Sequence, residues 1–273
     1  MTTDEIMALA VKMAGFPGVP EDSAIFVGGR NIRKVLFGVD VGPAELMVAK
    51  ELGMDLVIAH HPTGVYLDQW KVLLRHVEFM TAAGVPEDAA LGAVAERIEA
   101  TKLRGQISNF DQTPSVARLL GMPFMNIHAP LDELGRRRMI EAVNRVLSGG
   151  NARAVDVVNA LAALPEMAAA ATTVQQVLGD PISPARKVVV AHGALTNGGY
   201  PVAKTCFDHG VDAVIYIHID YGDLQRLRAE GRGNLIIVGH LAGDSLGFTP
   251  FIAELRRRGL QVTTFSGVID ATT

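Results

Sequence analysis

The stretch Asp55-Leu-Val-Ile-Ala-His60-His61-Pro62 ends a short apolar run with two adjacent histidines and a proline. The β-branched pair Val57-Ile58 and the preceding Gly-Met-Asp turn predict a buried strand of an α/β sheet. Ligand sites in such sheets gather at the carboxyl ends of strands. Because Pro62 fixes φ and turns the chain, both imidazoles could converge on a metal ion. The alternative is a hydrogen-bonded histidine at a strand end.

This strand belongs to a strand–helix–strand unit that occurs twice in the sequence. A predicted strand at 34–40 and a helix from Pro43 to about Leu52 precede it, which makes a β-α-β unit with a right-handed crossover. A second unit has a strand at 187–191, a helix from Pro201 and a strand at 210–218. The Gly, Asp, Val, Ile and His of that last strand match those of 53–61 at the offset 210 − 53 = 157. The matched order of elements favours internal duplication.

Further elements follow from hydrophobic periodicity and from the positions of glycine and proline. A third strand–helix–strand run covers 234–238, 240–258 and 261–265. Helices are predicted at 4–14, 68–83, 86–103, 114–121, 135–147 and 160–171, and a strand edge at 106–111. The fold class is therefore α/β.

Composition excludes several classes of protein. The 273 residues are 49% hydrophobic and 20% charged, so the chain can bury a large core. A net charge of −4 argues against an electrostatic nucleic-acid binder. The single cysteine, Cys206, excludes an intrachain disulfide framework and multi-cysteine zinc sites. The acidic start lacks the basic region of a signal peptide, and no run of 18 apolar residues occurs. We expect a soluble, cytoplasmic protein without a membrane or nucleic-acid partner.

The candidate metal ligands lie at the ends of predicted strands and helices. They are His60, His61, Asp111, His240 and Asp244. His240 and Asp244 are four residues apart, so one helical turn places both on one face. Three imidazoles and two carboxylates suit zinc, iron or manganese, with one or two ions per chain.

The remaining histidines have simpler interpretations. Three of them fall in helices or near turns, where surface or capping roles are favoured: His76, His128 and His209. His192 and His218 end strands of the second repeat, so they are either the remnant of a duplicated site or hydrogen-bonded residues. Asp40, which ends the strand before the His-His pair, could line the cleft and orient a ligand.

The sequence resembles the Nif-three-like family (Ngg-one interacting factor three), known as GTP cyclohydrolase 1 type 2 homologues or dinuclear-metal-centre proteins. The resemblance runs from Val35 to the C-terminus and is poor between about 63 and 105. Its anchors are Gly38-Val-Asp40, the 55–62 stretch, Ser108-Asn-Phe-Asp111 and Gly239-His-Leu-Ala-Gly-Asp244. Family members place two metal ions on the His-His pair, on the Asp of a His-Thr-Asn-Leu-Asp motif, and on the His and Glu of Gly-His-x-x-x-Glu. By resemblance these become the five candidate ligands named above.

Two positions depart from the family pattern. The first histidine of His-Thr-Asn-Leu-Asp is Ile107 here, and the terminal glutamate is Asp244, which is one methylene shorter. The resemblance implies two intertwined, duplicated α/β lobes with mixed, largely parallel sheets. The first lobe would comprise 1–125 plus 235–273 and carry most of the metal site, and the second would comprise 126–234. It also implies a toroidal homohexamer whose metal sites face an internal cavity.

The leading functional hypothesis is a metal-dependent, cyclohydrolase-like hydrolase that acts on a nucleotide-like or other heterocyclic small molecule. The sequence lacks a Gly-x-x-x-x-Gly-Lys-Ser phosphate loop, which argues against ATP-driven chemistry. The alternatives are a metal chaperone or scaffold and a regulatory interaction protein in which the metal only holds the fold. Open coordination positions would favour hydrolysis, whereas a closed four-ligand shell would favour a structural role.

Overall fold

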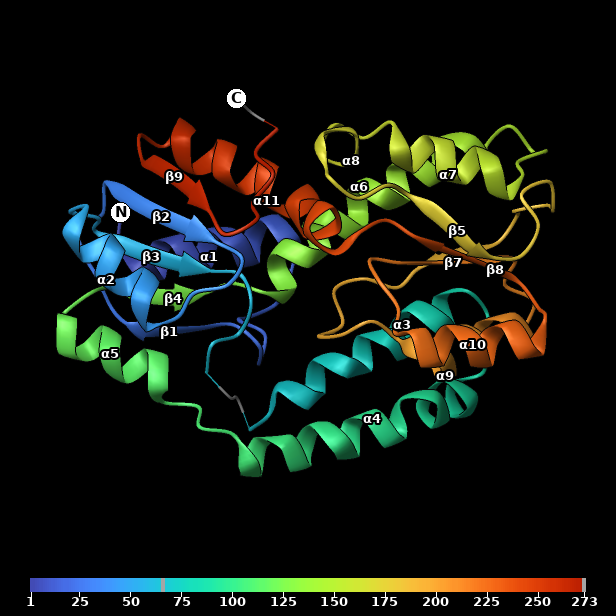
Figure 1. The fold of residues 1–273 in the computed structure, drawn as a ribbon, viewed down its shortest axis with the longest axis horizontal. Coiled ribbons are helices and arrows are strands. Elements are labelled where there is room, and N and C mark those ends of the chain that lie inside the picture. The colour runs from blue at the N-terminus through green and yellow to red at the C-terminus, as the bar shows by residue number, and fades with distance from the viewer. Residues whose placement is uncertain (65–66, 272–273) are drawn as a thin grey trace.

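Two β-sheets lie side by side in the computed structural model, which describes residues 1–64 and 67–271 (Figure 1). The first sheet has the order β1-β4-β3-β2-β9 and the second the order β5-β8-β7-β6. Their strands are β1 (Ala24–Val27), β2 (Lys34–Gly38), β3 (Leu56–Ala59), β4 (Phe124–Asn126), β5 (Gln175–Leu178), β6 (Val188–Val190), β7 (Ala213–Tyr216), β8 (Asn234–Ile237) and β9 (Gln261–Phe265). All paired strands are parallel except β1 with β4 and β5 with β8. The predicted α/β class with mixed, largely parallel sheets is confirmed.

The two sheets repeat one topology. β1 to β4 correspond in order, direction and pairing to β5 to β8, and β9 extends only the first sheet. Each antiparallel edge strand also carries a register shift at the equivalent place. The Asp55 carboxylate accepts hydrogen bonds from two consecutive backbone N–H groups at the entrance to β2, and Asp212 does the same at the entrance to β6. These two aspartates are a matched pair of the 157-residue repeat predicted from the sequence.

Helices cover both sheets. They are α1 (Thr3–Ala14), α2 (Pro43–Glu51), the 3-10 helix η1 (Gln69–Leu74), α3 (Arg75–Ala82), α4 (Glu87–Ile107), α5 (Gln112–Leu120), α6 (Ala129–Leu147), α7 (Ala154–Ala162), α8 (Pro165–Ala169), α9 (Gly199–Asp208), α10 (Tyr221–Glu230) and α11 (His240–Arg257). None of the helices within the described residues is both long and apolar enough to cross a membrane.

Three sequence-based element assignments are wrong. The strand edge predicted at 106–111 is absent, because α4 continues to Ile107 and the chain then runs irregularly to α5. Helix α6 begins at Ala129 rather than at Gly135, since Pro130 fits the first turn of a helix. The alanine-rich stretch 160–171 is divided between two helices, and Pro165 begins the second.

The chain passes between the two sheets more often than the predicted lobes allow. Strand β8 belongs to the second sheet, although residues 235–237 were predicted in the first lobe. Val77 and Met80 of α3 and Val94 of α4 pack in the same hydrophobic cluster as Val189 and Val214, so these helices cover the second sheet. Helices α3 and α4 pack with the second sheet because their apolar side chains are buried against it, which the order of the strands alone does not indicate.

Helices α6 and α11 cross between the sheets at two glycines (Figure 1). A Cβ on Gly247 would overlap the carbonyl oxygen of Leu131, and one on Gly135 would lie 3.0 Å from the carbonyl oxygen of Gly243. The helices can therefore approach backbone to backbone only because both positions lack a side chain. This contact brings the first turns of α6 and α11 together.

His76, which the sequence places on a surface or at a cap, is instead fully buried. Its Nε2 lies 2.9 Å from the Thr196 carbonyl oxygen, to which it donates, and burial lowers its pKa to about 4. The folded state therefore binds a proton less readily than the unfolded state, whose histidine has a pKa of about 6.5. Stability contributed by neutral His76 is complete above pH 6.5 and is lost as the pH falls towards 4.

We expect the free energy of unfolding of the parent to fall by roughly 2–3 kcal/mol more than that of His76→Gln between pH 7 and pH 4.5. Urea denaturation at both pH values measures this difference. His209→Gln is the matched control for the substitution itself, because His209 is exposed. Equal pH dependence in the parent and His76→Gln would contradict the assignment.

Candidate metal centre

Seven side chains meet between the two sheets. This His/Asp cluster consists of His60, His61, His128, Asp132, His192, His240 and Asp244. The five histidines follow β3, β4, β6 or β8, so the carboxyl ends of strands in both sheets supply them. The two aspartates lie one turn inside α6 and α11, next to the glycine crossing. The rule that ligand sites form at the carboxyl ends of parallel strands holds here for two sheets at once.

Four of the five predicted ligands are brought together. Asp244 is only 1% exposed, and its Oδ2 lies 3.7 Å from His60 Nε2, 3.5 Å from His61 Nε2 and 3.3 Å from His240 Nε2. Three imidazole nitrogens thus surround one carboxylate oxygen.

Asp111 is the predicted ligand that lies elsewhere. Its side chain is 54% exposed, and both carboxylate oxygens lie 2.6 Å from Nη2 of Arg118. The prediction depended on a strand ending at Asp111, but this residue instead precedes α5. Without that strand, no sheet edge carries its carboxylate to the cluster.

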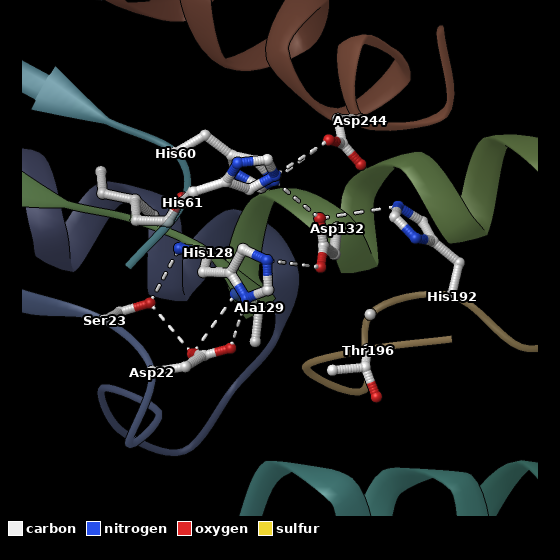
Figure 2. A network of polar contacts seen from close by, with 12 residues as sticks. Asp22, Ser23, His60, His61, His128, Ala129, Asp132, His192, Thr196 and Asp244 are labelled. Carbon is white, nitrogen blue, oxygen red and sulfur yellow. Dashed lines mark hydrogen bonds and ion pairs between the residues drawn. The ribbon is translucent and has the colours of Figure 1, made fainter. Parts of the chain in front are cut away.

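Asp132 is the main site residue that sequence reasoning missed. Its Oδ1 lies 3.2 Å from His60 Nε2 and 3.6 Å from His192 Nε2, and its Oδ2 lies 3.6 Å from His128 Nε2. The surface role predicted for His128 is wrong, since the residue is buried and its ring centroid is 4.7 Å from that of His60. His128 does occupy the N-cap position of α6, but its side chain makes no capping hydrogen bond. Figure 2 shows Asp132 between His128 and His192, with Asp244 reaching the same region from α11.

The sequence does contain a signal for these residues. His128-Ala-Pro-Leu-Asp-Glu-Leu-Gly135 and His240-Leu-Ala-Gly-Asp-Ser-Leu-Gly247 share His, Asp, Leu and Gly at the offset 240 − 128 = 112. Each segment follows a corresponding strand, β4 or β8, and each ends at the glycine of the helix crossing. A helix that begins at Gly135, as predicted, excludes His128 and Asp132, so the predicted elements do not reveal this repeat.

Hydrogen bonds on the outer side of three imidazoles fix their orientation. His60 Nδ1–H donates to the Ile127 carbonyl oxygen at 3.0 Å. His61 Nδ1 lies 2.7 Å from Asp40, and His128 Nδ1 lies 2.7 Å from Asp22. A proton on Nδ1 leaves the Nε2 lone pair free to face the cluster, as in metal-bound histidines held by a carboxylate or carbonyl. Asp40 thus has the orienting position expected from the sequence.

The buried atoms of the cluster lack the partners that burial normally requires. Within the part of the chain that the structure describes, these atoms accept or donate no hydrogen bond: His60 Nε2, Asp132 Oδ1, His192 Nε2, and both carboxylate oxygens of Asp244. Leaving such groups desolvated and without hydrogen bonds costs free energy, most of all for carboxylates.

A divalent cation would satisfy these atoms. Ligands at about 2.0–2.2 Å in a tetrahedral shell are separated by roughly 3.4 Å, and the nitrogen–oxygen pairs of the cluster span 3.2–3.7 Å. Among residues 1–64 and 67–271, three groups of side chains have ligand atoms close enough to hold an ion: His60-His61-His128, His61-His240-Asp244 and His60-Asp132-Asp244. The residues present therefore fit a metal ion.

Two histidines of the cluster, His61 and His128, have raised pKa values, whereas burial lowers the pKa of His192. Burial alone would lower the pKa of His61, but the nearby carboxylates of Asp244 and Asp40 outweigh burial and raise that pKa. Burial likewise opposes protonation of His128, yet the negative charges of Asp132 and Asp22 raise its pKa to about 9. The two buried aspartates thus require a proton or a metal cation close by.

A cavity of about 380 Å³ opens onto the cluster and is large enough for a small molecule. Its wall includes Arg97, Arg104, Asn197 and His218 beside the cluster residues. The ring centroid of His218 lies 4.8 Å from that of His240. His192 belongs to the cluster itself, whereas His218 lines the cavity next to it.

Solved structures similar to this chain include relatives at different levels of sequence identity. No family model and no curated protein matches the chain. The crystal structure of a NIF3 superfamily protein from Sphaerobacter thermophilus is 47% identical, covers 98% of both chains and has a TM-score of 0.96. Reduced HcgD from Methanocaldococcus jannaschii is 13% identical over 97% of both chains, with a TM-score of 0.59. TTHA1606 from Thermus thermophilus is 18% identical over 97% of both chains, with a TM-score of 0.52. The latter two share the fold.

Proposed function

The chain belongs to the NIF3 superfamily, and on that basis we propose that it is a metal-dependent hydrolase. We further propose a substrate that is a nucleotide-like or other heterocyclic small molecule, as for a GTP cyclohydrolase 1 type 2 homologue. The observation that carries the proposal is the buried His/Asp cluster at the wall of a cavity of about 380 Å³. Such a combination of metal ligands and open space is typical of metal-assisted hydrolysis.

In this proposal, His60, His61, His240 and Asp244 hold zinc, iron or manganese. A divalent cation in such a site polarises the bond that is cleaved and increases the acidity of water. Asp40 keeps the Nε2 lone pair of His61 directed at the ion by accepting a hydrogen bond from Nδ1–H.

His218 can assist by donating a hydrogen bond to the substrate. The side-chain oxygen Oδ1 of Asn197 accepts the Gly199 backbone N–H at 2.9 Å, which fixes the orientation of the Asn197 amide. Its Nδ2 therefore donates to His218 Nδ1 at 3.0 Å. Neutral His218 must then carry its proton on Nε2, where it is available to a molecule in the cavity.

The proposal is tested by a hydrolase screen with nucleotides and heterocyclic amides, using protein loaded with zinc, iron or manganese. We expect activity that chelator removes and added metal restores, and that His61→Ala loses. His209→Ala should retain it, because His209 is exposed on the C-terminal end of α9. Activity that is insensitive to both chelator and His61→Ala would contradict metal-dependent hydrolysis.

A metal chaperone or scaffold is the second candidate. The cluster offers five imidazoles and two carboxylates, so protein ligands alone could fill a coordination shell. A chaperone would transfer its ion to an acceptor within minutes and show no turnover in the screen. A regulatory protein would retain the ion and only unfold without it.

We also propose that the chain assembles as a homohexamer. Exposed apolar side chains on the adjacent helices α2 and α5 support assembly, among them Met47, Val48 and Leu119. Multi-angle light scattering should give six times the 29.1 kDa mass of one chain. A monomer across a wide concentration range would refute the assembly and leave the metal site unaffected.

A further inference from the structure

We propose that Arg97 and Arg104 of α4 form a binding site for a phosphate group in the wall of the cavity that opens onto the His/Asp cluster. Such a site would select phosphorylated substrates, so the proposal rests on the function proposed above and narrows its substrate class. Both arginines lie in the part of the sequence, about 63 to 105, where the family resemblance is poor, and the resemblance gives them no role.

The first argument is the placement of the two arginines on one face of α4. They are seven residues apart, which is two helical turns, so they project on the same side of the helix with Cα atoms about 10 Å apart. Both line the cavity of about 380 Å³ together with cluster residues such as His192 and Asp244. α4 runs from α9, which packs on the second sheet, towards α5, which packs on the first (Figure 1). The helix thus carries both positive charges along the wall of the cavity.

The second argument is that both guanidinium groups have unused donors. Arg97 Nη1 donates to Thr196 Oγ1 at 3.0 Å and to the Asn197 carbonyl oxygen at 2.7 Å, which holds this half-buried side chain in place. Among the described residues, Nε and Nη2 of Arg97 and the side-chain nitrogens of Arg104 donate no hydrogen bond, and neither arginine forms an ion pair. A guanidinium presents its N–H groups as a planar fork that matches the oxygens of an anion.

The third argument is the charge of the cavity wall. The carboxylates that line it within the described residues are Asp132, Asp220 and Asp244. Asp132 and Asp244 belong to the cluster, where a divalent cation would compensate them. In the metal-loaded protein, the two arginines would then outweigh Asp220, and this part of the wall would attract an anion.

The adjoining cavity of about 440 Å³ also reaches both arginines, but its charge is less favourable to an anion. It adds the carboxylates of Glu96 and Asp223, and its further arginine, Arg226, lies 3.5 Å from an Asp223 carboxylate oxygen. We therefore place the anion in the cavity that holds the cluster.

The number of arginines indicates the class of anion. A phosphate monoester carries a charge of about −1.5 to −2 at pH 7, which two guanidinium groups match. A single carboxylate would leave one of them without a counter-charge. The phosphate would be held on α4, at a different part of the wall from the His/Asp cluster.

Calorimetric titration of inorganic phosphate tests the site, both in zinc-loaded protein freed of excess zinc and in metal-free protein. Arg104→Gln should weaken phosphate binding by roughly 10-fold or more in both forms, because it removes a charge-assisted donor fork. Arg104 is exposed and its side chain has no partner among the described residues, so the variant should fold as the parent does. Arg97→Lys keeps the charge but removes the fork, and should also weaken binding.

Lys102→Gln is the matched control. It removes one positive charge from the same helix, but the Lys102 ammonium lies over the Trp70 ring, 4.0 Å from its centroid, and not in the cavity wall. Phosphate affinity should equal that of the parent. Acetate should bind the parent roughly 10-fold more weakly than phosphate does. Equal affinity for acetate and phosphate would contradict the assignment to phosphate.

The zinc content of each preparation separates this proposal from the proposed function. A parent that binds phosphate through Arg104 but retains no zinc would overturn only the metal-dependent hydrolase. A parent that retains zinc, but binds no phosphate or binds it as tightly in Arg104→Gln as in Lys102→Gln, would overturn only the phosphate site. In the hydrolase screen, phosphorylated compounds should be preferred, and Arg104→Gln should raise their KM with little change in kcat.

Discussion

Asp244→Asn is expected to weaken zinc binding by more than about 100-fold, the largest effect of any single polar substitution in the cluster. Asp244 Oδ2 is the atom on which His60, His61 and His240 converge, and the amide of asparagine keeps its shape while removing its charge. Calorimetric titration of zinc into metal-free protein measures the change.

The same substitution should also lower the stability of the metal-free protein. Burial opposes ionisation of Asp244, but its contacts with His61 and His60 outweigh burial and hold the pKa of its carboxyl below the usual value, so the fold favours the charge that asparagine removes. Asp111→Asn is the control, because that carboxylate is exposed and paired with Arg118. Equal zinc affinity in the parent and Asp244→Asn would show that Asp244 is not a ligand.

Gly247→Ala is expected to lower the free energy of unfolding by about 3 kcal/mol or more. The added Cβ would overlap the Leu131 carbonyl oxygen, which is a backbone atom of α6 and cannot rotate away. Separating the helices would also move Asp132 and Asp244 apart, so metal affinity should fall with stability. Urea denaturation and zinc titration of the same preparation measure both effects.

Gly92→Ala in α4 provides the matched control. A Cβ at Gly92 meets no atom within 4 Å, so the only effect is the higher helix propensity of alanine, about 1 kcal/mol in favour of folding. A Gly247→Ala variant that is as stable as Gly92→Ala would contradict the close crossing of α6 and α11.

Local sequence patterns were enough to predict four residues of the site: His60, His61, His240 and Asp244. The β-branched run before His60, the proline after His61 and the four-residue spacing of His240 and Asp244 act within one strand end or one helical turn. The repeat that pairs Asp55 with Asp212 was also visible, because both residues hold the entrance of a strand. The structure contains these features as predicted because each depends on residues that are close together in the sequence.

The positions of the remaining residues are set by contacts between distant parts of the chain, which the hydrophobic periodicity of the sequence does not reveal. The helical pattern of α4 continues to Ile107, into the strand expected at 106–111, and Asp111 is left exposed just before α5. Asp132 becomes a site residue only because glycines let α6 and α11 cross closely. His76 is buried because α3 packs on the second sheet, a contact between distant parts of the chain.

Anomalous diffraction at the zinc absorption edge, from crystals soaked in zinc, tests most directly whether the His/Asp cluster is a metal centre. We expect a peak at about 2.0–2.2 Å from His61 Nε2, His240 Nε2 and a carboxylate oxygen of Asp244. Zinc peaks confined to exposed residues, with none inside the cluster, would contradict the metal centre and the hydrolase proposed from it.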